Sequence, residues 1–184
     1  MVLPPPAGWR PFSFDRFDML SSALGASAPD FSTDHFRRTL AQFATGVTVV
    51  TVRLPEGCFH GVTVSSFNSV SLEPPLVLWS LARKARSMPV FAASGHYLIN
   101  VLSAGQADLA TRFARAEERH FDGLQFELSR TGLPVFPDVA AWFECRNRSQ
   151  YAEGDHVIFV GEVERCALNA TRALGFHGGR FVII

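Results

Sequence analysis

The sequence predicts a mainly β fold, an antiparallel barrel flanked by a few short helices. Segments of strand character outnumber segments of helical spacing by about two to one, judged by alternation and β-branched content. The connections between them are short, and short connections favour antiparallel neighbours because a parallel pair needs a long crossover. The 17 phenylalanines of the chain predict an aromatic-rich core.

The strands follow from β-branched and apolar runs that turn residues separate. Leu54-Pro55-Glu56-Gly57 has the composition of a hairpin loop, and Gly154-Asp155 that of a tight turn. We expect strands over residues 47–53, 60–66, 76–81, 97–102, 141–150, 157–168 and 180–184.

Three helices are expected between these strands. Ser32 or Thr33 can cap the first, whose Phe36, Leu40 and Phe43 form one apolar stripe, and Gly46 is expected to end it. Residues 88–93 and 106–114 have the length and spacing of two further helices.

The length of 184 residues fits one domain with a sizeable core. Residues 1–30 mix Pro, Gly, Ser and Ala with scattered aromatics, which indicates a surface-lying or disordered extension. We therefore divide the chain into an extension, residues 1–30, and a single barrel domain, residues 31–184.

The charge balance argues against a nucleic-acid partner. Seventeen basic residues balance 17 acidic ones, so no concentrated positive face is indicated.

The three cysteines, Cys58, Cys145 and Cys166, are widely spaced, which indicates neither a disulfide framework nor a zinc site. No signal-peptide pattern opens the sequence, and no apolar run approaches the ~20 residues that span a bilayer. The expected location is the cytoplasm, without membrane attachment.

Several large enzyme classes are excluded by missing motifs. The sequence contains no G-x-G-x-x-G after a strand, no P-loop, no H-E-x-x-H and no G-x-S-x-G. The six histidines lie apart from one another, so their spacing predicts no metal site. The chemistry must therefore come from individual segments.

The informative segment is the polar ribbon Gly61–Pro75. Hydroxyls, an amide and backbone N–H groups follow one another there, and such groups can bind the edge of a heterocycle and a phosphate. On composition alone, an ordinary polar strand face with Ser/Thr turns is the better explanation of the ribbon.

Other segments in register with the ribbon decide between these interpretations. Thr45-Gly46-Val47-Thr48-Val49-Val50-Thr51, Leu72-Glu73-Pro74-Pro75, Arg86-Ser87, Ile99-Asn100-Val101-Leu102 and Gly154-Asp155-His156 occur in order along the chain. In order and spacing, this set over residues 35–182 resembles the short-chain flavin reductases, the NAD(P)H-dependent partners of two-component flavin monooxygenases. The resemblance implies an FMN-binding Greek-key split β-barrel and a homodimer.

The resemblance also implies a set of cofactor contacts. Ser65 to Ser69 would contact the isoalloxazine and ribityl part of the flavin, Arg86-Ser87 would bind phosphate, and His156 would face the nicotinamide as the catalytic residue. The implied cofactor-binding set is Thr48, Thr63, Ser65, Ser66, Phe67, Asn68, Ser69, Ser71, Leu72, Arg86, Ser87, Gly154, Asp155 and His156.

The sequence departs from the family pattern in two places. Ala85 stands where the family often has a serine before the arginine, which removes one hydroxyl from the phosphate site. The closing aromatic pair, Phe176 and Phe181, encloses an altered interior, and we assign Arg180 no role. Phe113 and Phe121 could cover a flavin, but apolar residues at helical spacing are more often core.

The implied activity is hydride transfer from NADH or NADPH to FMN or FAD, with reduced flavin passing to a partner monooxygenase. Hydride transfer is cofactor chemistry, so it needs no acid–base dyad in the protein. Two alternatives keep the fold: a protein whose tightly bound flavin acts directly on an organic substrate, and a non-catalytic flavin or haem carrier. The sequence distinguishes neither FMN from FAD nor NADH from NADPH.

Overall fold

The computed structural model describes residues 29–115 and 120–184. The chain divides into two compact units, Met1–Arg37 and Arg38–Ile184, and every strand belongs to the second. The predicted extension, residues 1–30, lies almost wholly outside the described residues, so the boundary at residue 30 stays a prediction.

Strands dominate the described residues, which confirms the prediction of a mainly β, antiparallel fold. The helices are α1 (Thr33–Leu40), α2 (Met88–Ala93) and α3 (Ala107–Ala114). The strands are β1 (Thr45–Gly46), β2 (Thr48–Arg53), β3 (Phe59–Val64), β4 (Asn68–Leu72), β5 (Pro75–Ala82), β6 (His96–Val101), β7 (Glu127–Leu128), β8 (Pro134–Val135), β9 (Ala141–Glu153), β10 (His156–Leu168), β11 (Leu174–His177) and β12 (Arg180–Ile183).

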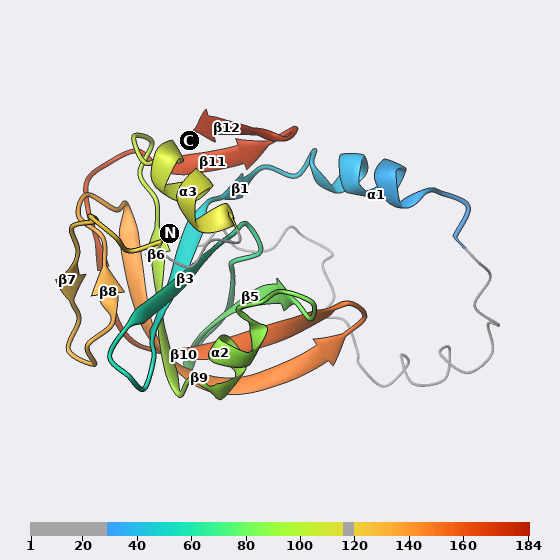
Figure 1. Cartoon of the computed structure of the whole chain (residues 1–184). Helices are drawn as coiled ribbons and strands as arrows, with labels where there is room; N and C mark the ends of the chain where they lie inside the picture. Colours follow the sequence, from blue (N-terminus) through green and yellow to red (C-terminus); the bar gives the residue numbers. More distant parts are fainter. Residues whose placement is uncertain (1–28, 116–119) are drawn as a thin grey trace, which may run out of the picture. The chain divides into compact units, whose positions relative to one another are not determined.

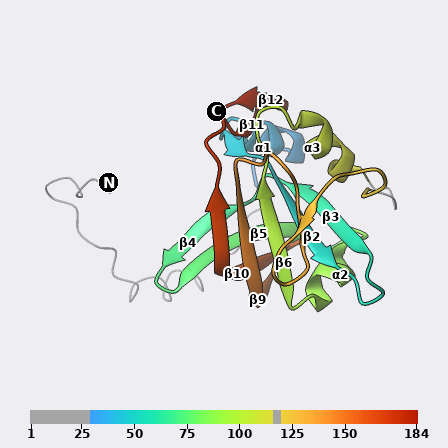
Figure 2. The same cartoon turned by 90° about the vertical axis from the view of Figure 1, so that its left-hand side faces the viewer.

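One seven-stranded sheet forms the body of the second unit, in the order β3-β2-β6-β9-β10-β5-β4, with every pair antiparallel. Figure 2 shows β10, β9, β6, β2 and β3 side by side in this order. The sheet curls so that its two ends approach each other, and β3 contacts β5. The β11–β12 hairpin pairs with β1 in a second, small sheet (Figure 1).

Two aromatic clusters fill the core, as the phenylalanine content predicts. Inside the curled sheet, Trp79 and Phe159 stack with ring centroids 4.5 Å apart, and Tyr97 meets Trp79 edge-on. Under α3, Phe113 and Phe136 lie 5.3 Å apart among buried aliphatic residues. Aromatic pairs at such distances add to the free energy of burial alone.

The hairpins agree with the sequence-based turns. Gly57, at a φ of 88° that favours glycine, donates its N–H to the Leu54 carbonyl and closes the loop between β2 and β3. Gly154, with a φ of 57°, makes the turn between β9 and β10. The two long strands that meet at this turn pair over their whole lengths.

The first helix is shorter than expected. Ser32 Oγ accepts the His35 N–H and caps α1, but the helix ends at Leu40. Gly46 lies in β1 opposite Gly175, so the expectation that it terminates the helix is wrong. The sheet pairing of Thr45-Gly46 with β11 draws this segment out of the helix. The side chains of Phe36, Leu40 and Phe43 are all exposed.

The strand β4 is the main element that the sequence analysis omitted. It pairs with β5 across an irregularity between Ser69 and Ser71, and most of its residues are exposed. The strand is short and rich in serine, so it has the composition of a loop although Ser69-Val70-Ser71-Leu72 alternates polar and apolar residues.

Candidate active site

Three hollows lie next to one another around the strand β3. The α2 cavity, of about 350 Å³, lies between β3, the loop before α2 and the end of α3. The β5 hollow, of about 280 Å³, lies between the end of β3 and β5. The hairpin hollow, of about 180 Å³, lies between β3, α3 and the β11–β12 hairpin. The α2 cavity alone reaches the range of about 300–1,000 Å³ that small-molecule sites occupy, and the other two are smaller hollows beside it.

Shared residues join the three hollows. Thr63 and Ser65 line both the β5 hollow and the hairpin hollow. Ala114 lines both the hairpin hollow and the α2 cavity. The hollows therefore form one continuous concave surface, with a polar end, an apolar side and a basic end.

The α2 cavity contains the basic end. Arg86 is exposed and Ser87 is buried, and both line the cavity just before α2 begins at Met88. Three further residues with polar side chains line it: His60, Arg115 and His120. A guanidinium and a hydroxyl placed together bind phosphate oxygens well, since the guanidinium fork matches their geometry.

The β5 hollow contains the polar end, where the two ends of the sheet meet. The Ser80 N–H donates to Ser66 Oγ at 2.9 Å, and the Ser66 hydroxyl donates to the Ser80 carbonyl at 3.0 Å. Ser65 stands next to this bridge and is exposed. His156, from the start of β10, lines the same hollow.

The turn Gly154-Asp155-His156 holds the His156 imidazole by a local hydrogen bond. Asp155 Oδ1 and His156 Nδ1 are 2.6 Å apart. This hydrogen bond is the main cause of the lowered pKa of the Asp155 carboxyl, which therefore stays ionised near neutral pH. A carboxylate only accepts, so Nδ1 carries the hydrogen and Nε2 of the neutral ring is an acceptor.

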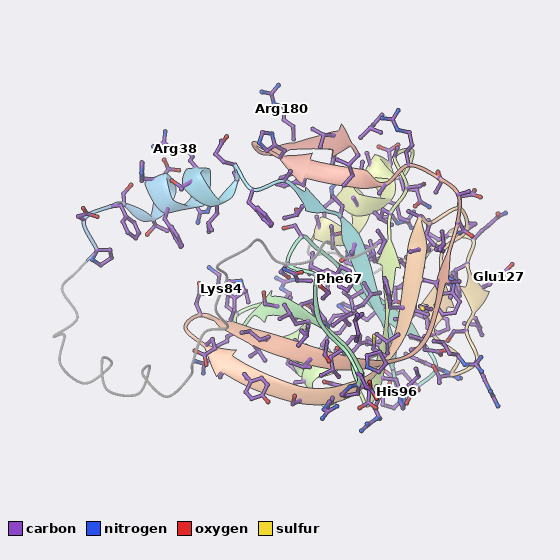
Figure 3. The ribbon with its side chains drawn as sticks, turned by 180° about the vertical axis from the view of Figure 1, so that it is seen from behind. Arg38, Phe67, Lys84, His96, Glu127 and Arg180 are labelled. Atoms are coloured by element: carbon purple, nitrogen blue, oxygen red, sulfur yellow. The ribbon has the colours of Figure 1, made fainter. Side chains whose placement is uncertain are left out.

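Figure 3 shows Lys84 near the tip of the β9–β10 hairpin, where the Arg83 N–H donates to the Asp155 carbonyl. Because this bond ties the loop before α2 to the turn of His156, both segments meet at the same end of the sheet. Gly154 and Asp155 themselves line none of the three hollows. They act on the site through the position of His156.

Several sequence-predicted residues are directed elsewhere. Thr48 is 1% exposed, its hydroxyl donates to the Val64 carbonyl between β2 and β3, and it lines none of the three hollows. Phe67 packs against the core with its ring 5.4 Å from Phe143, and Figure 3 shows it directed into the barrel. The residues Asn68, Ser69, Ser71 and Leu72 lie on β4 and line none of the hollows.

Part of the polar ribbon has structural partners. Thr63 lines two hollows, but its hydroxyl donates to the Ala110 carbonyl and holds α3 on β3. Asn68 Oδ1 accepts the Ser69 N–H, and Ser71 Oγ accepts the Glu73 N–H, which are short-range turn bonds. The hydroxyls of Ser65 and Ser69 both lack a protein partner in the described chain, and of these two serines Ser65 is the one that lines the hollows.

Sequence reasoning missed two side chains of the site, His60 and His120. Both line the α2 cavity, and their ring centroids are 6.2 Å apart. They come from different elements, so no spacing in the sequence connects them.

The aromatic pair of the closing hairpin lies at the site, as the sequence motif places it at the end of the domain. Phe176 and Phe181 are paired across β11 and β12 with ring centroids 5.7 Å apart, and both line the hairpin hollow. Arg180 projects away from this hairpin (Figure 3).

The phenylalanines of the α3 region are core residues. Phe113 is 1% exposed and packs with Phe121 and Phe136. Among the residues that the structure describes, no group of three or more His, Cys, Asp or Glu side chains forms a metal site. No helix within the described ranges has the length and hydropathy needed to cross a bilayer.

The chain is similar in sequence to known flavin reductases. Residues 40–184 match the model of the flavin reductase like domain. The chain is 50% identical over 146 residues to the FMN reductase (NADH) SmoA of Agrobacterium fabrum, covering 79% of this chain and 83% of that protein. It is 40% identical over 152 residues to the stachydrine N-demethylase reductase subunit Stc3 of Rhizobium meliloti, covering 82% of this chain and 66% of that one. It spans half the length of a probable flavin reductase of the same organism.

A solved structure shows the same fold. The NADH:FAD oxidoreductase SgcE6 of Streptomyces globisporus, in complex with NAD and FAD fragments, superposes with a TM-score of 0.79 at 37% identity. The match covers 85% of this chain and 96% of that one. It confirms the predicted antiparallel split barrel, and the match to the domain model confirms the resemblance drawn from the sequence. The chain belongs to the family of flavin reductase like domains.

Proposed function

We propose that this protein is an NAD(P)H:flavin oxidoreductase that transfers hydride from a nicotinamide to FMN or FAD. One observation carries the proposal: a single strand, β3, lines a basic cavity at one end and the hollow that contains Ser65 and His156 at the other. A flavin nucleotide has the matching distribution of charge, with a polar ring at one end and phosphate at the other. Family membership and the names of the relatives support the same assignment.

The phosphate end of the flavin fits the α2 cavity. Arg86 supplies a cation that reaches solvent, and Ser87 supplies a hydroxyl at a buried position whose backbone carbonyl is already engaged in the first turn of α2. The charged hydrogen bond from Arg86 is the stronger of the two contacts. Arg86 therefore mainly determines the affinity for the flavin phosphate, and Ser87 determines the orientation of that phosphate.

The ring end fits the surface on either side of Ser65. The exposed hydroxyl and backbone of Ser65 are available for the heteroatoms of the isoalloxazine, while Phe176 and Phe181 give the neighbouring hollow an apolar wall. When bound, the nicotinamide donates a hydride that the flavin accepts, and this chemistry belongs to the cofactors. The chain orients the nicotinamide ring against the flavin ring and prevents other arrangements of the two rings.

His156 is assigned to the nicotinamide side. Its side chain is 47% exposed and lines the β5 hollow, and its Nδ1 is fixed by Asp155. The free Nε2 acceptor then suits an amide N–H of the incoming nicotinamide. His156 acts by binding and orientation, since hydride transfer needs no proton from it.

A spectrophotometric assay tests the proposal. Purified protein is mixed with NADH or NADPH, with and without FMN or FAD, and absorbance of the reduced nicotinamide is followed. The expected result is oxidation that depends on added flavin. No flavin-dependent oxidation with either nicotinamide would refute the proposal. Stoichiometric flavin that survives dialysis would instead support direct action of a bound flavin on an organic substrate.

We further propose that reduced flavin passes to a partner monooxygenase. Stc3 is named as a reductase subunit, and the exposed positions of Ser65 and His156 suit a flavin that exchanges with solvent. The test is to mix the protein with flavin-dependent oxygenases encoded beside it and to measure product formation that requires both proteins.

We also propose a homodimer located in the cytoplasm. Several large apolar side chains of the second unit are exposed, among them Val70 and Leu72 on β4 and Leu168 at the end of β10. Exposed apolar side chains on an edge strand such as β4 favour contact with a second copy of the chain. Light scattering coupled to size exclusion tests the dimer, and fractionation of the source cells tests the location.

A further inference from the structure

Two histidines lie next to each other in the wall of the α2 cavity, beside the residues proposed to bind phosphate. His60 lies on β3, and His120 lies beyond the end of α3. Their ring centroids are 6.2 Å apart, and Arg86, Ser87 and Arg115 line the same cavity. The neighbouring side chains are aromatic: Phe91 lies 5.9 Å from His60, and Phe113 lies 5.2 Å from His120.

The hydrogen bond of His120 determines its tautomer. Nε2 of His120 lies 2.8 Å from the carbonyl oxygen of Arg115. A carbonyl only accepts, so Nε2 carries a hydrogen and donates. The other ring nitrogen, Nδ1, is an acceptor in the neutral ring and becomes a donor to an anion only when a proton is added.

The imidazole of His60 has no hydrogen-bond partner among the described residues, and it is partly buried against Phe91. Burial, reinforced by the nearby His120, lowers the pKa of His60 below its ordinary value. The charged groups that line the cavity are Arg86 and Arg115, and no carboxylate of the described chain lines it. In the free protein, His60 is therefore mainly neutral near pH 7, and an added proton is repelled.

An anion in this cavity reverses that balance. A phosphate within reach of the two rings attracts an imidazolium and provides an acceptor for its N–H groups. The pKa of His60 is then higher in the complex than in the free protein, so binding takes up protons. By linkage, binding that takes up protons strengthens as pH falls.

We propose that His60 and His120 form a proton-dependent phosphate subsite, in which binding of the phosphate end of a flavin is coupled to protonation of the imidazole pair. The inference rests on the proposed function, because it assigns the occupant of the α2 cavity. It gives the two histidines a role in affinity and selectivity for phosphorylated flavins. Riboflavin, which lacks the phosphate, is bound without this coupling.

Calorimetric titration tests the coupling directly. FMN and riboflavin are each titrated into the protein near pH 7 in two buffers with different ionisation enthalpies, and the difference in heat gives the protons taken up. For one coupled proton, the affinity for FMN rises by at most about tenfold per pH unit as pH falls. The free phosphate of FMN itself titrates near pH 6, so the decisive quantity is the difference between protein variants.

The variants are His60→Gln and His120→Gln, with His96→Gln as the matched control. His96 lies at the start of β6, pairs with Glu164 at 3.4 Å, and lines none of the three hollows. We expect proton uptake with FMN to fall in both cavity variants and to be unchanged in the control. Riboflavin binding is expected to show the same small uptake in all four proteins.

The outcomes separate the inference from the proposed function. If the wild type binds FMN and His60→Gln takes up as many protons as the wild type does, the inference is wrong and the proposed function stands. If the wild type binds none of FMN, FAD and riboflavin, both are wrong. Circular dichroism establishes that each variant is folded, and His60→Gln, at a partly exposed position, gives the decisive comparison should His120→Gln not fold.

Discussion

Ser66 and Ser80 exchange two hydrogen bonds and thereby hold the link between β3 and β4 on β5. Ser80 donates from its backbone N–H to Ser66 Oγ, and Ser66 donates from its hydroxyl to the Ser80 carbonyl. Ser66 lies just before β4, in line with the pairing of Asn68 opposite Leu78, so this bridge extends the β4–β5 pairing toward the end of β3. It also forms one wall of the β5 hollow, next to Ser65.

Replacing Ser66 by alanine is expected to destabilise the protein, whereas replacing Ser65 is not. Ser66→Ala leaves the partly buried Ser80 N–H without its partner, which costs about 1–3 kcal/mol in the free energy of unfolding. Ser65→Ala removes an exposed hydroxyl and is expected to change stability by less than about 0.5 kcal/mol while weakening flavin binding. Urea denaturation and fluorescence titration with FMN measure the two effects. Equal stability of the two variants would contradict this account of the bridge.

Arg86→Ala is expected to weaken FMN binding by about tenfold or more while leaving riboflavin binding unchanged. The reason is the loss of a charge-assisted hydrogen bond, typically about 1.5–3 kcal/mol. Arg83→Ala is the matched control, since Arg83 is exposed and lines none of the three hollows. Titration of each variant with both flavins is the measurement. A similar loss of affinity for both flavins in Arg86→Ala would show that the flavin phosphate does not bind in the α2 cavity.

His156→Ala is expected to raise KM for the nicotinamide several-fold, with the dissociation constant of the flavin unchanged. A single lost hydrogen bond to the nicotinamide amounts to about 1 kcal/mol. Asp155→Asn is a milder variant, because the amide oxygen that it introduces can still accept from Nδ1 of His156 but carries no charge. Steady-state kinetics with NADH at saturating flavin provide the measurement. An unchanged kcat/KM in His156→Ala would exclude a role for this imidazole.

Gly61→Ala is expected to displace Phe113 and to disturb the α2 cavity. A Cβ at this position would lie 2.6 Å from Cε1 of Phe113, closer than atoms of this kind approach each other. Overpacking of this sort costs about 1–3 kcal/mol, and it pushes α3 away from β3. Gly95→Ala is the control, because nothing lies within 4 Å of the position of its Cβ. Thermal unfolding and FMN affinity are measured, and similar behaviour of the two variants would contradict the close packing of Phe113 on Gly61.

Glu144→Gln is expected to destabilise the protein at neutral pH and to remove a part of its acid sensitivity. The Glu144 carboxyl is 1% exposed; burial raises its pKa, but hydrogen bonds from Ser129 and Thr131 lower it by more, so the folded pKa lies below the usual value. A lowered folded pKa contributes stability above the unfolded pKa, and this stability is lost as pH falls below about 4.5 toward the folded pKa.

Chemical denaturation of the wild type and Glu144→Gln between pH 7 and pH 4 tests this sign. The variant is expected to be less stable by about 1–3 kcal/mol at pH 7, and the difference is expected to shrink toward acid pH. A difference that grows on acidification would mean that the folded pKa of Glu144 is raised.

The sequence by itself determined the local elements and the family. The β-branched run before Arg53, the hairpin loop ending at Gly57 and the turn at Gly154 are properties of short segments, because backbone preference and side-chain periodicity act over a few residues. For the same reason, the motifs containing Arg86 and His156 could be matched in order to a known family, and the structure brings both to the concave surface around β3.

Only the tertiary structure decided which side chains share that surface. Thr48 belongs to a matching motif, yet the pairing of β2 with β3 and β6 buries it. The serines of β4 are polar like Ser65, yet pairing with β5 carries them away from the hollows. His60 and His120 meet because α3 packs on β3. Such proximities depend on long-range packing, and no short-range preference of the chain encodes them.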